Sequence, residues 1–194
     1  MKKRRSWGLR VFMLLLVLSL LAAAALWYVR PEHSLDMNYS ELRWKDKLTR
    51  MIETRKPEVE LSEEEFNDLA KQNLVRALQS HGELPVKITG TQFELAGDRL
   101  TVHLNGAWGA VKFGAAARYV MEYFQDRLIL TPEAVKVRSL SFPPQIFGLE
   151  QVEVDPGPYV PDPVAIQNIV FQDRQITIKL SLDWLEIARY LSSY

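Results

Sequence analysis

The apolar residues near the start of the chain form one unbroken segment rather than a periodic pattern. Residues 11–29 are apolar apart from Ser19. A helix rises about 1.5 Å per residue, so this segment matches the roughly 30 Å hydrocarbon thickness of a bilayer. Trp27 and Tyr28 lie at its far end, and amphipathic rings favour the headgroup region. The pattern predicts a transmembrane anchor over residues 11–29.

The charges around this segment predict its orientation. The bases that precede it are Lys2, Lys3, Arg4, Arg5 and Arg10. The first acidic residue of the chain is Glu32. Because basic flanks stay in the cytoplasm, we expect residues 1–10 to form a cytoplasmic basic tail. The rest of the chain is then expected outside the cell membrane, as the C-terminal part of a single-pass protein.

A cleaved signal peptide is the alternative interpretation of the same segment. Residues 22–25 supply small side chains in the A-x-A arrangement that a signal peptidase recognises. The apolar run continues past this site to Val29, whereas the apolar part of a signal peptide is usually only about 7–15 residues long. An uncleaved signal-anchor accounts for the extra residues, so we expect the anchor to be retained.

Residues 30–57 combine many charges with apolar residues at approximately helical spacing. The apolar positions are Leu35, Tyr39, Leu42, Leu48, Met51 and Ile52. They predict a juxtamembrane helical segment with one narrow apolar face, ended by Pro57. This segment is either a stalk or partner-docking helix, or a helix packed on its own domain. Its bases are interpreted as a solvated face: Arg43, Lys45, Lys47 and Arg50.

A strong helix start follows. Ser62 and Glu65 have the spacing of a capping box, in which each side chain bonds the backbone N–H of the other residue. A stripe expected to be buried comes next, at Phe66, Leu69, Ala70, Asn73, Leu74, Ala77 and Leu78, and Gly82 supplies the stop. Only Asn73 interrupts the apolar pattern, either as a site residue or as a hydrogen-bonded polar group at the edge of the stripe.

After Pro85 the period of apolar residues changes to two, which predicts strands. Short turns of similar sequence separate the apolar runs, at residues 97–99, 125–127 and 172–174. Such turns join hairpins. We therefore predict an α+β fold: the N-terminal transmembrane helix, then a curved antiparallel β-meander of about five to seven strands in one sheet, packed against one or two helices. Residues 58–194 form the extracytoplasmic α+β domain, with a short helical tail at residues 183–191.

The strand expected at residues 111–124 is the most informative one. Its first half consists largely of glycine and alanine, so another element or a ligand can approach the sheet closely. We expect a helix there. One face of this strand carries Phe113, Ala117, Tyr119, Met121 and Tyr123. These five residues are the candidate lining of an apolar groove between sheet and helix.

Prolines concentrate between Pro143 and Pro163, which hold six of the ten in the chain. This stretch also contains Phe142, Phe147 and Tyr159. Either it is a partner-binding loop, or it is an ordered crossover that places its aromatic residues in the core.

Composition excludes several classes of function. The chain contains no cysteine, so it has no disulfide, thiolate zinc site, catalytic thiol or acylated cysteine. Of its 24 Lys and Arg residues, five precede the anchor, which leaves 19 bases against 24 acids in the rest. A mildly acidic domain is a poor partner for nucleic acid, so we expect none.

Sequence motifs of catalysis and of cofactor binding are missing as well. The three histidines have no metal-ligand spacing, and there is no nucleophile elbow, Walker loop or dinucleotide-binding glycine pattern. We therefore predict no catalytic residue, metal or cofactor. The function expected is that of a non-enzymatic, membrane-anchored extracytoplasmic scaffold or accessory protein of the cell envelope, with a protein partner. The alternative is a lipid- or lipid-intermediate-binding module that uses the apolar groove.

The order of these features resembles a known family. It comprises the basic start, one span, the capped helix with LSEEEFN at residues 61–67, the meander, and VKV at residues 135–137 leading to LSFP at residues 140–143. The chain resembles the YpmS-like family of membrane-anchored proteins of Gram-positive bacteria over most of its length. The resemblance implies an extracytoplasmic location and this fold, and it implies no catalytic residues.

Overall fold

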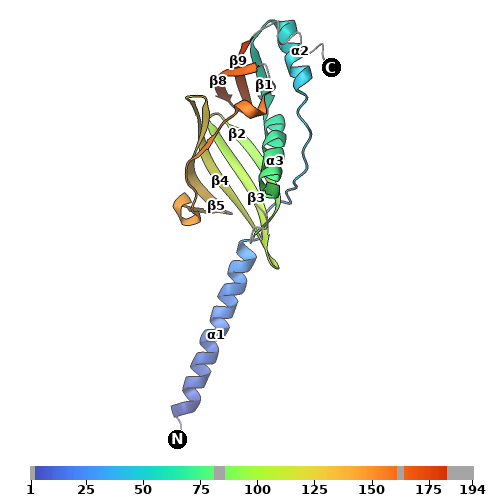
Figure 1. Cartoon of the computed structure of the whole chain (residues 1–194). Helices are drawn as coiled ribbons and strands as arrows, with labels where there is room; N and C mark the ends of the chain where they lie inside the picture. Colours follow the sequence, from blue (N-terminus) through green and yellow to red (C-terminus); the bar gives the residue numbers. More distant parts are fainter. Residues whose placement is uncertain (1–2, 81–85, 161–163, 183–194) are drawn as a thin grey trace.

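The structure is a computed structural model that describes residues 3–80, 86–160 and 164–182 (Figure 1). It is α+β, as predicted. The first helix, α1 (Lys3–Tyr28), stands clear of the domain, and its stretch Arg10–Tyr28 is long and apolar enough to cross a membrane. The helical tail predicted at residues 183–191 lies outside the described residues.

The strands form two antiparallel sheets that do not close into a barrel. The larger sheet has the order β2 (Lys87–Ala96), β3 (Arg99–Trp108), β4 (Val111–Phe124), β5 (Arg127–Val137) and β6 (Leu140–Phe142), and β7 (Val152–Val154) also pairs with β5. The smaller sheet has the order β1 (Glu58–Ser62), β9 (Gln175–Leu182) and β8 (Val164–Gln172). All three predicted hairpin turns are present.

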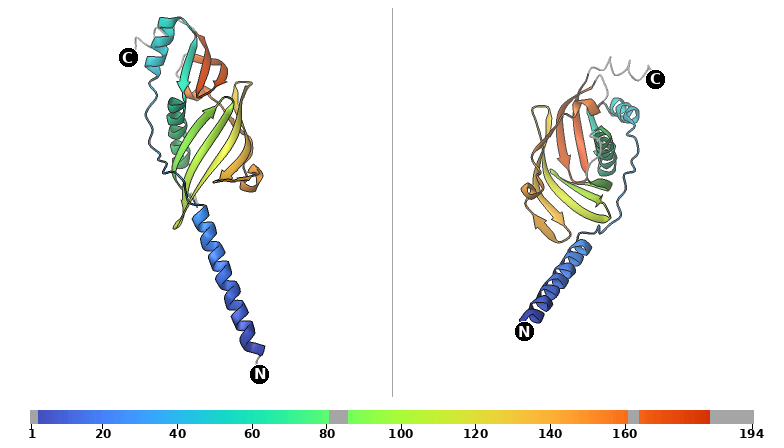
Figure 2. Two further views of the ribbon diagram at one scale, coloured as in Figure 1. Left: turned by 180° about the vertical axis from the view of Figure 1, so that it is seen from behind. Right: turned by 60° about the horizontal axis from the view of Figure 1, so that its bottom comes forward.

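The prediction of a single sheet was wrong. The short strand β1, which precedes the capped helix, pairs with β9 over its whole length. This pairing holds the last hairpin in a separate sheet above the meander (Figure 2). The two strands are more than a hundred residues apart in sequence, and no local pattern reports such a pairing.

Two helices pack on the domain, α2 (Trp44–Thr54) and α3 (Glu63–Ser80). The capping box at the start of α3 is confirmed: Ser62 N donates to Glu65 Oε2 at 2.9 Å, and Glu65 N donates to Ser62 Oγ at 3.3 Å. The helix lies along β2, the edge strand of the larger sheet (Figures 1 and 2). Short 3-10 turns, η1 (Pro144–Phe147) and η2 (Gly157–Tyr159), lie in the proline-rich stretch.

The expectation that the apolar stripe of α3 is fully buried was wrong. Leu74 is half-buried and Ala77 is exposed, whereas the one buried residue of this helix is Lys71. The reason is geometric: α3 follows an edge of the sheet and does not cross its face. Its apolar side therefore faces a cavity, which is described below.

The helical segment predicted over residues 30–57 is helical only in α2, and residues 31–43 form an extended linker instead. Helix α2 packs on its own domain, which is one of the two roles left open by its sequence. Leu48 and Met51 are buried in the main core. The expectation that Lys47 lies on a solvated face was wrong. The Lys47 side chain is only 15% exposed and its Nζ lies 2.6 Å from Glu65 Oε1, and it also donates to Glu60 O at 2.7 Å. Lys47 therefore joins α2 to β1 and to the start of α3.

The linker after α1 runs across the larger sheet on the face opposite the core. Gly114 N of β4 donates to Val29 O at 2.9 Å, Asn105 Nδ2 of β3 donates to His33 O at 2.7 Å, and Thr91 N of β2 donates to Asp36 O at 3.0 Å. The linker is thus the element that approaches the small residues of β4. Our expectation of a helix there was wrong, because the linker, an extended segment, occupies that space.

Close approach of the linker requires glycine at two strand positions. A Cβ added to Gly90 would overlap the Leu35 carbonyl oxygen, and one added to Gly114 would lie 2.9 Å from Pro31 Cα. Both neighbours are backbone atoms, which cannot move aside without moving the linker. These glycines therefore let the linker lie against the sheet.

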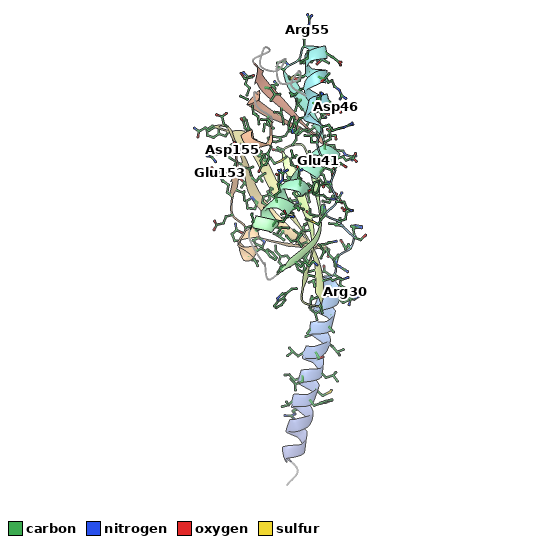
Figure 3. The ribbon with its side chains drawn as sticks, turned by 45° about the vertical axis from the view of Figure 1, so that its right-hand side comes forward. Arg30, Glu41, Asp46, Arg55, Glu153 and Asp155 are labelled. Atoms are coloured by element: carbon green, nitrogen blue, oxygen red, sulfur yellow. The ribbon has the colours of Figure 1, made fainter. Side chains whose placement is uncertain are left out.

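The outer end of α1 also contacts the domain directly. The guanidinium of Arg138 lies over the rings of Trp27 and Tyr28, at 5.2 and 5.4 Å from their centroids, and Tyr28 Oη is 2.9 Å from Ser139 Oγ. Figure 3 labels Arg30 at this junction. The turn between β5 and β6 is therefore seated on α1, and the linker bonds hold the domain in one orientation relative to it.

Candidate functional site

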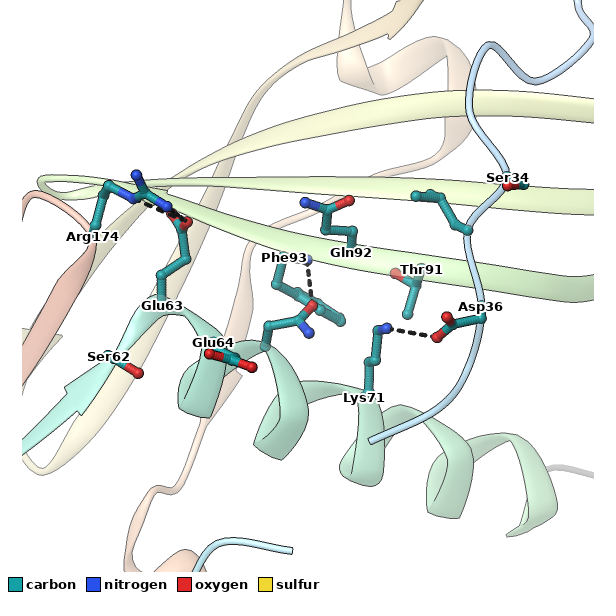
Figure 4. Close-up of a pocket in the computed structure, with 12 residues that line it drawn as sticks. Ser34, Asp36, Ser62, Glu63, Glu64, Lys71, Thr91, Gln92, Phe93 and Arg174 are labelled. Atoms are coloured by element: carbon teal, nitrogen blue, oxygen red, sulfur yellow. Dashed lines mark hydrogen bonds and ion pairs between the residues drawn. The ribbon is translucent and has the colours of Figure 1, made fainter. Parts of the chain in front are cut away.

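A polar groove of about 550 Å³ runs between the linker, α3 and β2 (Figure 4). Two ion pairs cross it. Lys71 Nζ lies 3.0 Å from Asp36 Oδ1, and Arg174 Nη2 lies 3.1 Å from Glu63 Oε1. Lys71 is only 8% exposed, and a buried ammonium is unfavourable without a partner. The hydrogen bond from Lys71 lowers the pKa of Asp36 below its ordinary value, and a second bond from Asn38 N adds to the effect.

Polar groups of this groove cap the free edge of the larger sheet. Thr91 N bonds the linker, Phe93 N donates to Asn67 Oδ1 at 2.9 Å, and Leu95 N donates to Glu63 Oε2 at 2.9 Å. These are three successive outward N–H groups of β2. An uncapped edge strand invites pairing with another chain, so the groove has a structural role that accounts for its charges.

The second space is an apolar cavity of about 260 Å³ between α3 and both sheets. Its lining comprises Trp44, Leu61, Phe66, Leu69, Ala70, Asn73, Phe93, Leu100, Leu128, Leu130, Val154, Pro156, Tyr159, Val160, Ile166, Ile169, Phe171, Ile176 and Ile178. Asn73 is the only amide among them, and its Nδ2 donates to Leu69 O at 2.9 Å. Asn73 thus has the hydrogen-bonded role that the sequence left as one alternative.

Size and chemistry restrict what this cavity can hold. Apolar cavities of about 150 Å³ bind a benzene molecule, and pockets for drug-sized ligands begin near 300 Å³. Among the described residues that line it, none has a charged side chain. The cavity therefore suits a section of one hydrocarbon chain, and it suits neither a headgroup nor a whole lipid.

The five residues predicted to line a groove lie elsewhere. Met121 is buried in the main core, and Tyr119 and Tyr123 pack against that core half-buried. Phe113 contacts the backbone at Gly106, while Ala117 lies half-buried between its neighbours in β3 and β5.

None of these five residues lines the cavity. A groove on their face stays a prediction, and the apolar space that the structure contains belongs to other residues.

Burial affects the two tyrosines of this group. It raises the pKa of Tyr119 above its ordinary value. Burial raises the pKa of Tyr123 as well, and the carboxylate of Asp126, which accepts a hydrogen bond from Tyr123 Oη at 3.3 Å, raises it further. Both phenols therefore stay neutral hydrogen-bond donors near neutral pH.

The cavity combines residues that sequence analysis found with residues that it missed. Phe66, Leu69 and Ala70 belong to the predicted stripe of α3. The walls contributed by β8, β9 and η2 were missed, because their approach to α3 depends on the β1–β9 pairing. Tyr159 was noted only as an aromatic residue of the proline-rich stretch, and it lines the cavity from η2.

Across residues 3–80, 86–160 and 164–182, no group of three or more His, Asp or Glu side chains lies close enough to hold a metal ion. Two histidines of the described part, His33 and His103, line a recess beside the end of α1. No protein-family model, curated protein or solved structure matches the chain.

Proposed function

We propose that the chain is a single-span protein of the cell membrane, with residues 1–10 in the cytoplasm and the domain outside. The basic cluster before the span and the absence of acids before Glu32 support this orientation. Protease added to intact protoplasts should remove a tag fused to the C-terminus. A protected tag would contradict the orientation, and a secreted product beginning near Leu26 would contradict the retained anchor.

We further propose that the domain binds a hydrocarbon chain, such as an acyl or polyprenyl chain of a lipid or lipid intermediate. The apolar cavity between α3 and the two sheets is the observation that carries this proposal. Each methylene transferred from water into such a space gains about 0.8 kcal/mol. A few methylenes therefore offset the entropic cost of ordering the chain. The assignment includes no reaction.

The position of the cavity defines how such a ligand is bound. Leu100 of β3 lines the cavity, and Trp108 lies at the end of the same strand that is near α1. Eight residues separate them, so the cavity is about 26 Å along the strand from that end. A lipid that remains in the bilayer would not reach this far. The ligand is therefore a lipid that has left the membrane, with a section of one hydrocarbon chain shielded from water in the cavity and the remainder of the lipid outside it.

Native mass spectrometry of the full chain, extracted in mild detergent, tests this proposal. The wild-type protein should carry a lipid adduct that survives detergent exchange. In Ala70→Phe the added ring enters the cavity, so the adduct should disappear while the melting temperature holds. Ala77→Phe is the control, because Ala77 is on the same helix but does not line the cavity. A missing adduct in the wild-type protein, or equal adducts in all three proteins, would contradict the proposal.

A scaffold or accessory role in the cell envelope is the second candidate. The fixed joint between α1 and the domain favours it, because Gly114, Asn105 and Thr91 all hold the linker and keep the domain at a set orientation. Cross-linking in intact cells should then yield a protein partner in stoichiometric amount. A partner with an empty cavity would favour the scaffold, and a lipid adduct without a partner would favour lipid binding.

A further inference from the structure

Exposed apolar side chains gather at the end of the domain that is seated on α1. Outside α1, seven large apolar residues among those described are exposed, and four of them lie in the β3–β4 hairpin or in β6 and η1. These four are Trp108, Leu140, Ile146 and Phe147. Trp108 and Ile146 are the most exposed of the seven, at 68% and 66%. We call these four residues the foot of the domain.

The foot lies at the level where α1 leaves the membrane. Figures 1 and 2 show the β3–β4 turn and η1 at the same end of the domain as the outer end of α1. Trp27 and Tyr28, the interfacial rings of α1, contact Arg138 of the β5–β6 turn, so this level is fixed by direct contact. If α1 spans the bilayer, both parts of the foot meet the headgroup layer.

Charges at this end suit a surface of lipid phosphates. A recess of about 270 Å³ beside the linker is lined by Arg30, Lys136 and Arg138, and none of these three bases has a carboxylate within 4 Å among the described residues. Arg138 Nε is buried without a hydrogen-bond partner. The recess also contains two carboxylates, Glu32 and Glu94, together with His33 and His103, and Glu94 lies 3.1 Å from His103 Nε2.

Four of the acidic residues of the domain lie away from this end, although Glu32 and Glu94 line the recess itself. In Figure 3, Arg30 lies at the junction with α1, while the labelled acids Glu41, Asp46, Glu153 and Asp155 all lie farther from α1 than Arg30 does. A domain with a net negative charge would be repelled by anionic headgroups if it met them with those acids. These four acids therefore do not face the membrane, and the two carboxylates of the recess stand beside three bases, Arg30, Lys136 and Arg138.

We propose that the foot docks on the phospholipid surface in which α1 ends, with Trp108, Ile146 and Phe147 in the headgroup layer and Arg30, Lys136 and Arg138 toward lipid phosphates. Aromatic rings favour this layer, and guanidinium groups bond phosphate oxygens in a bidentate manner. Docking would prevent the domain from tilting and would hold the apolar cavity at a fixed height. This inference rests on the proposed membrane span and is independent of what the cavity binds.

Single-cysteine labelling tests the docking, because the chain contains no cysteine that would have to be removed. Trp108→Cys, Ile146→Cys and Phe124→Cys are each labelled with bimane in the full chain, in nanodiscs of mixed zwitterionic and anionic phospholipid. Phe124 is the control, since it is 55% exposed but lies at the β4–β5 turn, at the other end of the long strands. A lipid with a nitroxide on its headgroup quenches labels in the headgroup layer.

Labels at positions 108 and 146 should be quenched severalfold more than the label at position 124. Equal quenching at the three positions would overturn the proposal. Bimane labels at positions 108 and 146 whose emission is blue-shifted but not quenched would also overturn the proposal, because a protein partner would then cover the foot. Leu140→Cys provides a second site in β6 if either foot variant fails to fold. A chain that does not enter nanodiscs would contradict the membrane span instead.

The basic residues are tested in the same system. Lys136→Gln with Arg30→Gln should reduce quenching at position 146, and the reduction should be larger in anionic nanodiscs. Lys45→Gln with Arg50→Gln removes the same charge from α2, at exposed positions far from α1, and should leave quenching unchanged. An equal effect of the two pairs would show that net charge, and not the recess, governs the result.

Discussion

Replacing Gly90 by alanine should release the linker from the larger sheet. An ordinary exchange of glycine for alanine inside a strand stabilises a protein by about 0.5–1 kcal/mol. Here the new methyl group would overlap the Leu35 carbonyl oxygen and would lie 2.8 Å from Asp36 N. The linker has to move, and the bond from Thr91 N to Asp36 O at 3.0 Å is lost. The Lys71–Asp36 ion pair is strained by the same movement.

The expected cost follows from the burial of Thr91, which is fully buried. A buried N–H left without an acceptor costs about 1–3 kcal/mol. For a domain of this size, each kcal/mol shifts the melting temperature by about 2–4 °C. Gly90→Ala should therefore lower the melting temperature by roughly 2–12 °C. Hydrogen exchange measured by mass spectrometry should also become faster over residues 32–38.

Gly97→Ala is the matched control. Gly97 has φ +63°, and the nearest atom to its new methyl group would be Asp173 Oδ1 at 3.8 Å. Its cost is backbone strain alone, of about 1–2 kcal/mol, so this variant should melt earlier with unchanged exchange in the linker. If Gly90→Ala leaves exchange over residues 32–38 as slow as in the wild-type protein, the linker does not depend on close approach to β2 and the reasoning fails.

Three further predictions concern the polar contacts. Lys47→Met should lower the free energy of unfolding by about 1.5–3 kcal/mol, because two charged hydrogen bonds are lost. Lys45→Met, at an exposed position, should change the free energy of unfolding little. Equal effects of the two substitutions would show that Lys47 is solvated. Ser62→Ala should cost about 1 kcal/mol by removing one half of the capping box, and urea titration measures this loss. Partial burial raises the pKa of Glu65, but bonds from Lys47 and Ser62 outweigh it and lower the pKa overall, and the Lys71 bond lowers that of Asp36. The stability contributed by these two carboxylates is therefore complete above their ordinary pKa values of 4.5 and 3.8, and it is lost as the pH falls through their lowered pKa values. The melting temperature should be level from about pH 7 to 5. Asp36→Asn should weaken the decline in melting temperature below about pH 4.

Local patterns predicted the elements because their causes lie within a few residues. The Ser62 and Glu65 side chains bond each other's backbone across one helical turn, so the start of α3 follows from four residues. Alternation and short turns likewise predicted β2 to β5 and the last hairpin. The apolar spacing before Pro57 predicted a helix, and the buried residues of α2, Leu48 and Met51, were among those named. The helix is shorter than predicted, because Leu35, Tyr39 and Leu42 lie in the extended linker.

Contacts between distant segments explain the errors. Lys47 has the spacing of a surface base, and its side chain is mostly covered only because Glu65 is brought beside it. The small residues of β4 predicted a close approach, but their sequence does not show whether a helix or the linker makes it. The same holds for the cavity, whose α3 wall follows from helical periodicity while its β8 and β9 walls depend on the partner of β1. A groove on the face of Tyr119 and Met121 was predicted because aromatic and sulfur-containing residues gather there. It stays a prediction, and Met121 lies in the packed core.

Binding of a hydrocarbon chain in the cavity is tested most directly by photo-crosslinking in the membrane. The full chain is placed in vesicles that contain a phospholipid with a diazirine near the end of one acyl chain, and modified peptides are located by mass spectrometry after illumination. Adducts in α1 report lipid contact in every sample. We expect additional adducts on α3 near Leu69 and on β8 near Ile169, which line the cavity, and we expect their loss in Ala70→Phe but not in Ala77→Phe. Adducts confined to α1 and the foot would contradict hydrocarbon binding in the cavity.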